Sequence, residues 1–191
     1  MIVTQAFLGQ LAGILALLAY PVYIRGITAG KTRPNRATWW ILTLAASVLA
    51  ASYYAEGARD TMWIAVAYIF GNLAIAVLSL RYGYGSWTRA DKACLAAAIG
   101  SAILWWFLDA PGVALSATIV IDFFGILPTV YKSYNKPSTE SAAAWFIDGI
   151  SSIINMFAIG TWTFAIAAYP LYLLVTNCLI AYLVLRAKKR I

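Results

Sequence analysis

The chain has 191 residues, of which 63% are hydrophobic and only 11% are charged. A soluble domain is about 45–50% apolar and about 25% charged. A water-soluble particle of this size has too little polar surface to cover so much apolar material. The composition therefore excludes a soluble enzyme, a disordered protein and a nucleic-acid-binding domain, despite a formal net charge of +7. We predict an all-α integral membrane protein.

Few residues are available for chemistry. The chain has no histidine and two cysteines, Cys94 and Cys178, which both lie inside apolar runs. We interpret the cysteines as small core residues rather than as a disulfide or a thiol site. Because there is no histidine cluster, serine-based triad or metal-ligand spacing, we expect no enzyme, no metal and no cofactor. Any proton transfer falls to carboxylates.

Seven apolar runs are long enough to be membrane-spanning helices. About 20 apolar residues, at about 1.5 Å per residue, cross a hydrocarbon core of about 30 Å. In chain order the runs cover residues 4–24, 37–55, 62–80, 92–108, 112–131, 141–160 and 167–185. The first run has no basic region before it and is too long for the apolar part of a signal peptide, so we expect it to be retained.

Lysine and arginine predict the direction of these helices. The segments after the first, third and fifth spans, together with the tail, hold 13 of the 14 basic residues, and only Arg59 lies on the opposite side. The N-terminus is therefore predicted outside and the C-terminus in the cytosol. A bacterial cytoplasmic membrane suits the compact loops. The positive charge indicates this orientation, with the lipid bilayer as partner and no nucleic acid.

The eight tryptophans lie near the ends of the predicted spans. An interfacial belt of aromatic residues has this distribution, although one or two of the rings are open to stacking on a ligand. Trp39, Trp40 and Trp145 lie near inner ends, Trp63, Trp105, Trp106 and Trp162 near outer ends, and Trp87 in an inner loop.

The chain contains an internal repeat at a spacing of 105–107 residues. Pro21 in the first span corresponds to Pro128 in the fifth. Residues 72–81 and 177–186 align without a gap and are identical at six of ten positions, including Asn72 with Asn177. Four spans separate the copies, so both run the same way through the membrane. We therefore predict a 3+1+3 arrangement, with repeats over 1–85 and 111–191 and a linker helix over 86–110.

At these residues the chain resembles the SWEET and PQ-loop transporter superfamily, in which a linker helix joins two three-helix repeats. Each repeat here has a proline near the inner end of its first helix, and the stretch 136–140 (KPSTE) is similar to the K-S-x-E segment that opens the second helix of such repeats. The resemblance implies a transporter with Asn72 and Asn177 in its substrate pocket. Pro21 and Pro128 are the candidate hinges.

Two aspartates are predicted inside spans, where an ionisable group costs about 2.5–3.5 kcal/mol on insertion scales and marks a functional candidate. Asp122, Asn72 and Asn177 are expected about 15 Å deep, and Asp148 about 10–12 Å from the cytosolic side. No lysine or arginine lies at this depth, and a carboxyl group removed from water without a cation is more easily protonated.

Both aspartates are therefore candidates for proton coupling. Proton-coupled members of the superfamily, such as cystinosin-like carriers, have an acidic residue in the helix that corresponds to the one holding Asp148. The alternative is that each aspartate is hydrogen-bonded and only holds helices together.

The sixth span adds polar side chains at helical spacing. Asp148, Ser152 and Asn155 fall at i, i+4 and i+7 and share one face. Lipid would leave these groups unsatisfied, so we expect this face to line a water-accessible cavity. Phe157 and Tyr172 are expected to supply apolar or stacking contacts beside it.

These residues predict a membrane transporter that moves a small polar solute, sugar-like or other, by alternating access at a midplane site between the repeats. Proton coupling is left open, as is the choice among sugars, amino acids, nucleosides and vitamins. The alternative is a non-transporting receptor or scaffold of the same fold, but very short outer loops and a short basic tail favour transport. Two repeats suffice for one pathway, and a homo-oligomer is left open.

Overall fold

The computed structural model describes the chain except for residues 1, 56, 58, 109–110 and 189–191. In this part of the chain seven α-helices are present, and their bounds agree with the seven predicted runs to within a few residues. The elements are α1 (Ile2–Thr28), α2 (Arg36–Ala55), α3 (Met62–Tyr82), α4 (Arg89–Leu108), α5 (Pro111–Asn135), the short 3-10 helix η1 (Pro137–Thr139), α6 (Ala142–Phe157) and α7 (Phe164–Lys188).

The helices have the length and surface of membrane helices. Within the described residues, α1, α2, α3 and α7 are each long and apolar enough to cross a membrane, and α6 is apolar but shorter. Large apolar side chains face outward along the bundle, among them Phe70, Phe107 and Trp106, which is 76% exposed. Apolar patches of this kind mark a surface that lipid or a partner covers. These are the features of an all-α membrane protein.

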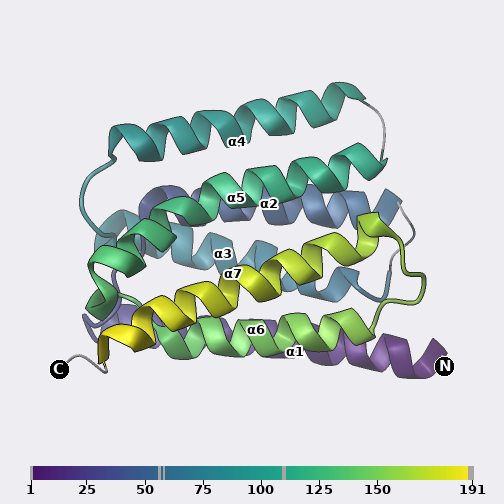
Figure 1. The fold of residues 1–191 in the computed structure, drawn as a ribbon, viewed down its shortest axis with the longest axis horizontal. Helices are drawn as coiled ribbons and strands as arrows, with labels where there is room; N and C mark the ends of the chain where they lie inside the picture. Colours follow the sequence, from purple (N-terminus) through teal and green to yellow (C-terminus); the bar gives the residue numbers. More distant parts are fainter. Residues whose placement is uncertain (1, 56, 58, 109–110, 189–191) are drawn as a thin grey trace.

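Six helices form a closed ring. Its order is α1, α3, α2, α5, α7, α6, and each helix packs against its two neighbours in that order. α4 lies outside the ring, against α5 and α2, and is the uppermost helix in Figure 1. The helices run alternately in opposite directions, so the two ends of the chain lie at opposite ends of the bundle (Figure 1).

Small residues let neighbouring helices approach closely, as is common in membranes. At Gly125 of α5 an added Cβ would lie 2.8 Å from Cγ2 of Ile41 in α2. The buried cluster around this contact contains Ala37, Ile41 and Ala45 of α2, Ala98 of α4 and Ile121 of α5.

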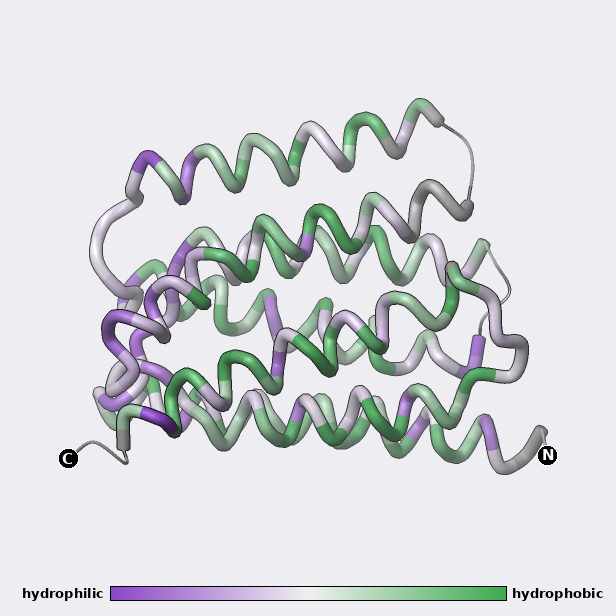
Figure 2. Tube along the Cα trace, in the orientation of Figure 1, coloured by the Kyte–Doolittle hydropathy of each residue, from purple (hydrophilic) through white to green (hydrophobic). Residues whose placement is uncertain are grey.

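Polar residues gather at the end of the bundle where α1, α3, α5 and α7 end (Figure 2). Side chains cap the helices that begin there. The Thr38 N–H donates to Asn35 Oδ1 (3.1 Å), and Thr88 and Asp91 exchange reciprocal bonds of 3.0 and 2.8 Å at the start of α4. Asn35 Nδ2 also donates to Asp91 Oδ1 (3.1 Å). This bond fixes the beginning of α4 against the beginning of α2.

The cysteines differ from their prediction as core residues. Both are free thiols, and Cys178 is exposed on α7 while Cys94 of α4 is only partly buried. An apolar run in a membrane helix faces lipid as well as neighbouring helices, so an apolar run does not by itself place a residue in the core. The core interpretation is wrong for Cys178.

Candidate functional site

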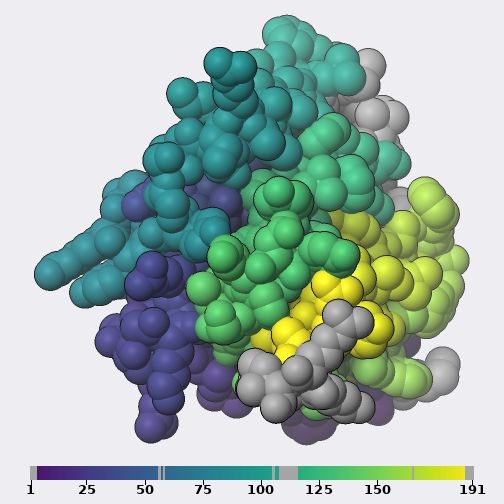
Figure 3. Space-filling model, turned by 60° about the vertical axis from the view of Figure 1, so that its left-hand side comes forward, coloured from purple at the N-terminus to yellow at the C-terminus, as the bar shows by residue number. Residues whose placement is uncertain are grey.

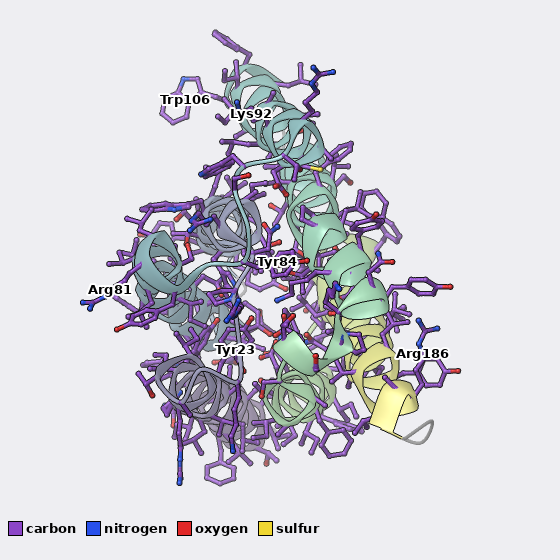
Figure 4. All side chains as sticks on the ribbon, turned by 90° about the vertical axis from the view of Figure 1, so that its left-hand side faces the viewer. Tyr23, Arg81, Tyr84, Lys92, Trp106 and Arg186 are labelled. Carbon is purple, nitrogen blue, oxygen red and sulfur yellow. The ribbon has the colours of Figure 1, made fainter. Side chains whose placement is uncertain are left out.

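A cavity of about 50 Å³ lies inside the ring and is lined by residues of all six ring helices. At about 10–15 Å³ for each water molecule, it has room for a few waters. Four predicted site residues line it: Asn72 of α3, Asp122 of α5, Asp148 of α6 and Asn177 of α7. The view along the helices shows Tyr23 pointing to the middle of the ring, whereas Arg81, Trp106 and Arg186 point away from it (Figure 4).

Asp148 joins three helices at the cavity. Its Oδ1 accepts a hydrogen bond from the hydroxyl of Tyr68 in α3 (3.0 Å), and its Oδ2 accepts one from Nδ2 of Asn177 in α7 (2.9 Å). Both donors are neutral, and no lysine or arginine of the described chain lines the cavity. Because α3 lies in the first half of the chain and α6 and α7 in the second, this carboxylate connects the two halves.

Asp122 connects two helices of the same half. Its Oδ2 accepts from the hydroxyl of Tyr169 and its Oδ1 from that of Tyr172, both at 2.9 Å and both from α7. Tyr172 is predicted to give an apolar or stacking contact beside the polar face of α6, but its hydroxyl instead donates to Asp122. Tyr172 itself is not one of the residues that line the cavity.

Asn72 connects the three helices of the first half. The Tyr20 hydroxyl of α1 donates to Asn72 Oδ1 (2.8 Å), and Asn72 Nδ2 donates to the carbonyl of Leu42 in α2 (3.1 Å). The ring of Tyr20 reaches this position because it lies flat against Gly71. A Cβ at Gly71 would be only 2.1 Å from Cε2 of that ring.

Three aromatic rings form the wall of the cavity toward the polar end of the bundle. Tyr23 belongs to the last turns of α1, and Trp39 and Trp145 belong to the first turns of α2 and α6. The ring centroids of Tyr23 and Trp39 are 4.8 Å apart, and those of Trp39 and Trp145 are 6.0 Å apart. All three side chains are buried and line the cavity.

This wall corrects the interpretation of the tryptophans as one interfacial belt. The interpretation is wrong for Trp39 and Trp145, whose helices present them to the inside of the ring. Trp40 is partly buried, and the side chain of Trp105 lies outside the described residues. The remaining tryptophans are exposed on the outside, as a belt requires: Trp63, Trp87, Trp106 and Trp162.

A buried ion pair lies beyond the aromatic wall. Lys132 at the end of α5 pairs with Glu140, and their side chains are 2% and 0% exposed. Lys132 Nζ also donates to the carbonyl of Arg33 (2.6 Å), and Trp145 Nε1 donates to Glu140 Oε1 (3.1 Å). The loop between α1 and α2 is thereby fastened to the segment that precedes α6. Figure 3 brings this end forward and shows the two segments together, in indigo and green.

Only part of the polar face predicted on α6 reaches the cavity. Ser152 is buried but donates to the carbonyl of Asp148 (3.0 Å) instead of lining the space. Asn155 lies about 10 Å further along the helix than Asp148, at 1.5 Å per residue. Phe157 is 67% exposed and faces away from the ring. The structure therefore does not bring Ser152, Asn155 or Phe157 to the cavity.

Asn155 occupies an unusual environment. Its side chain is 0% exposed, and neither its amide nitrogen nor its amide oxygen has a hydrogen-bond partner in the described chain. Further along, Ala158, Gly160 and Thr61 line a hollow of about 320 Å³ at the other end of the bundle. Asn155 thus stands between the cavity and this hollow along α6. A buried amide without partners costs about 1–3 kcal/mol.

The predicted hinge prolines lie inside continuous helices. Pro21 is within α1 and Pro128 within α5, and a third, Pro170, is within α7. Each proline removes one N–H from the helical ladder, which weakens the helix locally. Pro21 and Pro128 do not line the cavity.

Within the described residues, no group of three or more histidine, cysteine, aspartate or glutamate side chains is placed to hold a metal ion. The chain matches no family model, no curated protein and no solved structure. Its function is therefore inferred from its residues and their geometry.

Gly71→Ala tests how the Tyr20–Asn72 pair is built. The added methyl group overlaps the Tyr20 ring, so we expect a loss of about 1–3 kcal/mol, the range for overpacking a core. Thermal unfolding in detergent measures it. Gly100→Ala is the matched control, because nothing lies within 4 Å of a Cβ there and alanine favours a helix. A Gly71→Ala protein as stable as the original would contradict the close packing.

Proposed function

We propose that this protein is a carrier that moves a small polar solute across a membrane by alternating access. The observation that carries the proposal is the central cavity, where Asn72, Asp122, Asp148 and Asn177 meet at the middle of a closed ring of helices. Intramembrane polar groups that face the interior of a bundle mark substrate and ion pathways.

The order of the ring supports two parallel three-helix repeats joined by α4. Replacing α1, α2 and α3 by α5, α6 and α7 reproduces the same neighbours: α3 packs between α1 and α2, and α7 packs between α5 and α6. The contacts between the halves follow the same rule, since α1 packs on α6 and α5 packs on α2. A half-turn about an axis through the cavity relates these contacts, as expected for parallel repeats.

The two asparagines occupy related positions in this arrangement but have different partners. Asn72 donates to the carbonyl of Leu42, whereas Asn177 donates to the side chain of Asp148. Leu42 and Asp148 follow Trp39 and Trp145 by three residues each. The second repeat therefore carries a carboxylate where the first carries leucine, which gives the cavity one acidic side.

In the proposed orientation all seven helices cross a bacterial cytoplasmic membrane, with the N-terminus outside. The polar end of the bundle then faces the cytosol (Figure 2), in agreement with the rule that basic loops stay inside. The buried Lys132–Glu140 pair and the aromatic wall lie between the cavity and the cytosolic end. A hollow of about 320 Å³ is present at each end of the bundle, one that includes Thr61 on the outside and one that includes Thr32 on the cytosolic side.

Alternating access requires the barrier on the cytosolic side of the cavity to open. The two halves would rock about the cavity, with Pro21 and Pro128 as hinges near the closed end of α1 and α5. Asp148 connects the halves through Tyr68, so it is placed to couple a proton to this movement, with Asp122 as the second candidate. The resemblance to the SWEET and PQ-loop superfamily is consistent with such a carrier.

Uptake into proteoliposomes tests the proposal. A mixed panel of sugars, amino acids, amines and nucleosides is offered with inward, outward and no proton gradient. Saturable uptake of one solute class is the expected result. A folded protein that takes up none of them would overturn the carrier and favour a receptor or scaffold of the same fold.

A further inference from the structure

The hydrogen bonds to the two aspartates use up the hydroxyl protons of the surrounding tyrosines. The hydroxyl protons of Tyr68, Tyr169 and Tyr172 are all donated to Asp148 or Asp122. A tyrosine hydroxyl has a single proton. Of these three tyrosines Tyr68 lines the cavity, and its oxygen therefore offers only lone pairs to a molecule there.

The carboxylates keep spare accepting capacity. Each oxygen of Asp122 and Asp148 accepts one hydrogen bond in the described chain, whereas an ionised carboxylate has about four acceptor sites. Thr176, which also lines the cavity, donates its hydroxyl proton to the Tyr172 carbonyl (3.0 Å). Unused donors remain at the aromatic wall, where the Tyr23 hydroxyl and Trp39 Nε1 have no hydrogen-bond partner in the described chain. Beside the two aspartates the lining offers mainly acceptors, so the part of a solute that lies there must bring hydrogen-bond donors.

The charge of the residues that line the cavity also favours a solute that donates hydrogen bonds. Two carboxylates face one cavity, and no lysine or arginine of the described chain lines it. Lys132, the buried cation at the closed end, already pairs with Glu140. A carboxylate buried without a cation is costly, so a positively charged solute would remove that cost on binding.

The aromatic wall supplies the second half of a cation site. Tyr23, Trp39 and Trp145 line the same cavity as the carboxylates. Faces of tyrosine and tryptophan rings attract ammonium and guanidinium groups, and they also pack against apolar carbon skeletons. Carboxylates on one side and aromatic rings on another are the two elements of an organic-cation site.

We propose that the solute is a small organic cation, with an ammonium group held by Asp122 and Asp148 and an apolar part packed on Tyr23, Trp39 and Trp145. This inference rests on the proposed carrier and names its substrate class. It also sets the direction of coupling. A proton on either carboxylate removes a charge that the ammonium needs, so proton and cation compete for the site. Asp148, which bonds to Tyr68 of the other half, links this competition to the movement of the halves, so that proton and cation are exchanged across the membrane.

Acidification does not change the charge of the other titratable groups near the two carboxylates. In the described chain Tyr68 from α3 and Tyr169 and Tyr172 from α7 bond to the carboxylates, together with the Asn177 amide, which does not titrate. Tyr20 from α1 bonds to Asn72 beside them. α2 contributes only Trp39 and Leu42 to the lining. Lowering the pH should therefore weaken cation binding through the two aspartates.

Binding of 2-phenylethylamine and of 2-phenylethanol to the purified full-length protein tests the inference. The two probes share a carbon skeleton, but only the amine is charged. We expect the amine to bind about tenfold or more tightly than the alcohol, as charged hydrogen bonds allow, and its affinity to fall on acidification. Asp122→Asn and Asp148→Asn should each lower amine affinity about tenfold or more and leave alcohol affinity unchanged. Asp91→Asn, a buried carboxylate outside the cavity, is the matched control and should keep amine affinity.

The outcomes separate this inference from the carrier itself. Equal binding of amine and alcohol, a pH-independent amine affinity in the unmodified protein, or amine binding unaffected by both aspartate variants would each overturn the cation site. Uptake of a neutral sugar that the amine does not inhibit would overturn it too and leave the carrier intact. Selective amine binding without flux in proteoliposomes would support the site and overturn the carrier.

Discussion

Asp148→Asn is expected to abolish the solute accumulation that a proton gradient drives in proteoliposomes, while the protein remains folded. A difference of one pH unit stores about 1.36 kcal/mol per proton, which supports about a tenfold concentration ratio. We expect this ratio to fall to one in the variant. Asparagine has the shape of aspartate, and its Oδ1 keeps one of the two accepted hydrogen bonds. Its Nδ2 donates instead, to the Tyr68 oxygen or to Asn177 Oδ1 once that amide turns, so the loss of accumulation reports the missing titratable group.

Asp122→Asn is the matched control. Its partners Tyr169 and Tyr172 both belong to α7, so this carboxylate makes no hydrogen bond between the halves among the described residues. We expect the variant to need a higher solute concentration for half-maximal uptake but to reach the same final ratio, because the ratio depends on coupling and not on affinity. Continued accumulation by Asp148→Asn would remove Asp148 from proton coupling.

Lys132→Met is expected to loosen the closed end of the bundle. The substitution leaves Glu140 buried without its cation, and breaking a buried ion pair in this way costs about 3–5 kcal/mol. Hydrogen exchange of the backbone over residues 29–35 and 137–145 measures the effect. A cost of this size corresponds to local opening about a hundred to several thousand times more frequent.

Two further variants identify the cause. Lys136→Met removes an exposed lysine four residues away, so it should leave exchange unchanged. The double variant Lys132→Met with Glu140→Gln leaves neither charge buried alone and should recover part of the protection. If the single and double variants exchange equally fast, the buried charge is not what holds this end closed.

The sequence predicts the helices well because a hydrocarbon core accepts only long apolar runs with satisfied backbones. It also indicates four polar residues that line the cavity, since Asn72, Asp122, Asp148 and Asn177 stand out in apolar surroundings. Neither property depends on how a helix is rotated about its axis. That is why both can be predicted from a single chain.

The rotation of each helix is what the sequence does not provide. α1, α3 and α7 are apolar around their whole circumference, so an aromatic ring on them has the same neighbours in sequence whether it faces lipid or the cavity. For this reason the sequence does not indicate Tyr20, Tyr23 and Tyr68 as residues of the cavity, and the predicted position of Phe157 beside the cavity is wrong. On α6 the polar face is longer than the cavity it borders, which leaves Ser152 and Asn155 beyond it.

The position of α4 has a consequence for how the two halves enter the membrane. α4 packs outside the ring on α5 and α2, and among the described residues it contributes nothing to the lining of the cavity. In the proposed arrangement α4 adds one crossing of the membrane between the repeats. This extra crossing gives the second repeat the same direction as the first. In a chain lacking 86–110, the second half would cross the membrane in the opposite direction, with its basic loops outside. Two separate chains, 1–85 and 111–191, each inserted with its N-terminus outside, would not need α4.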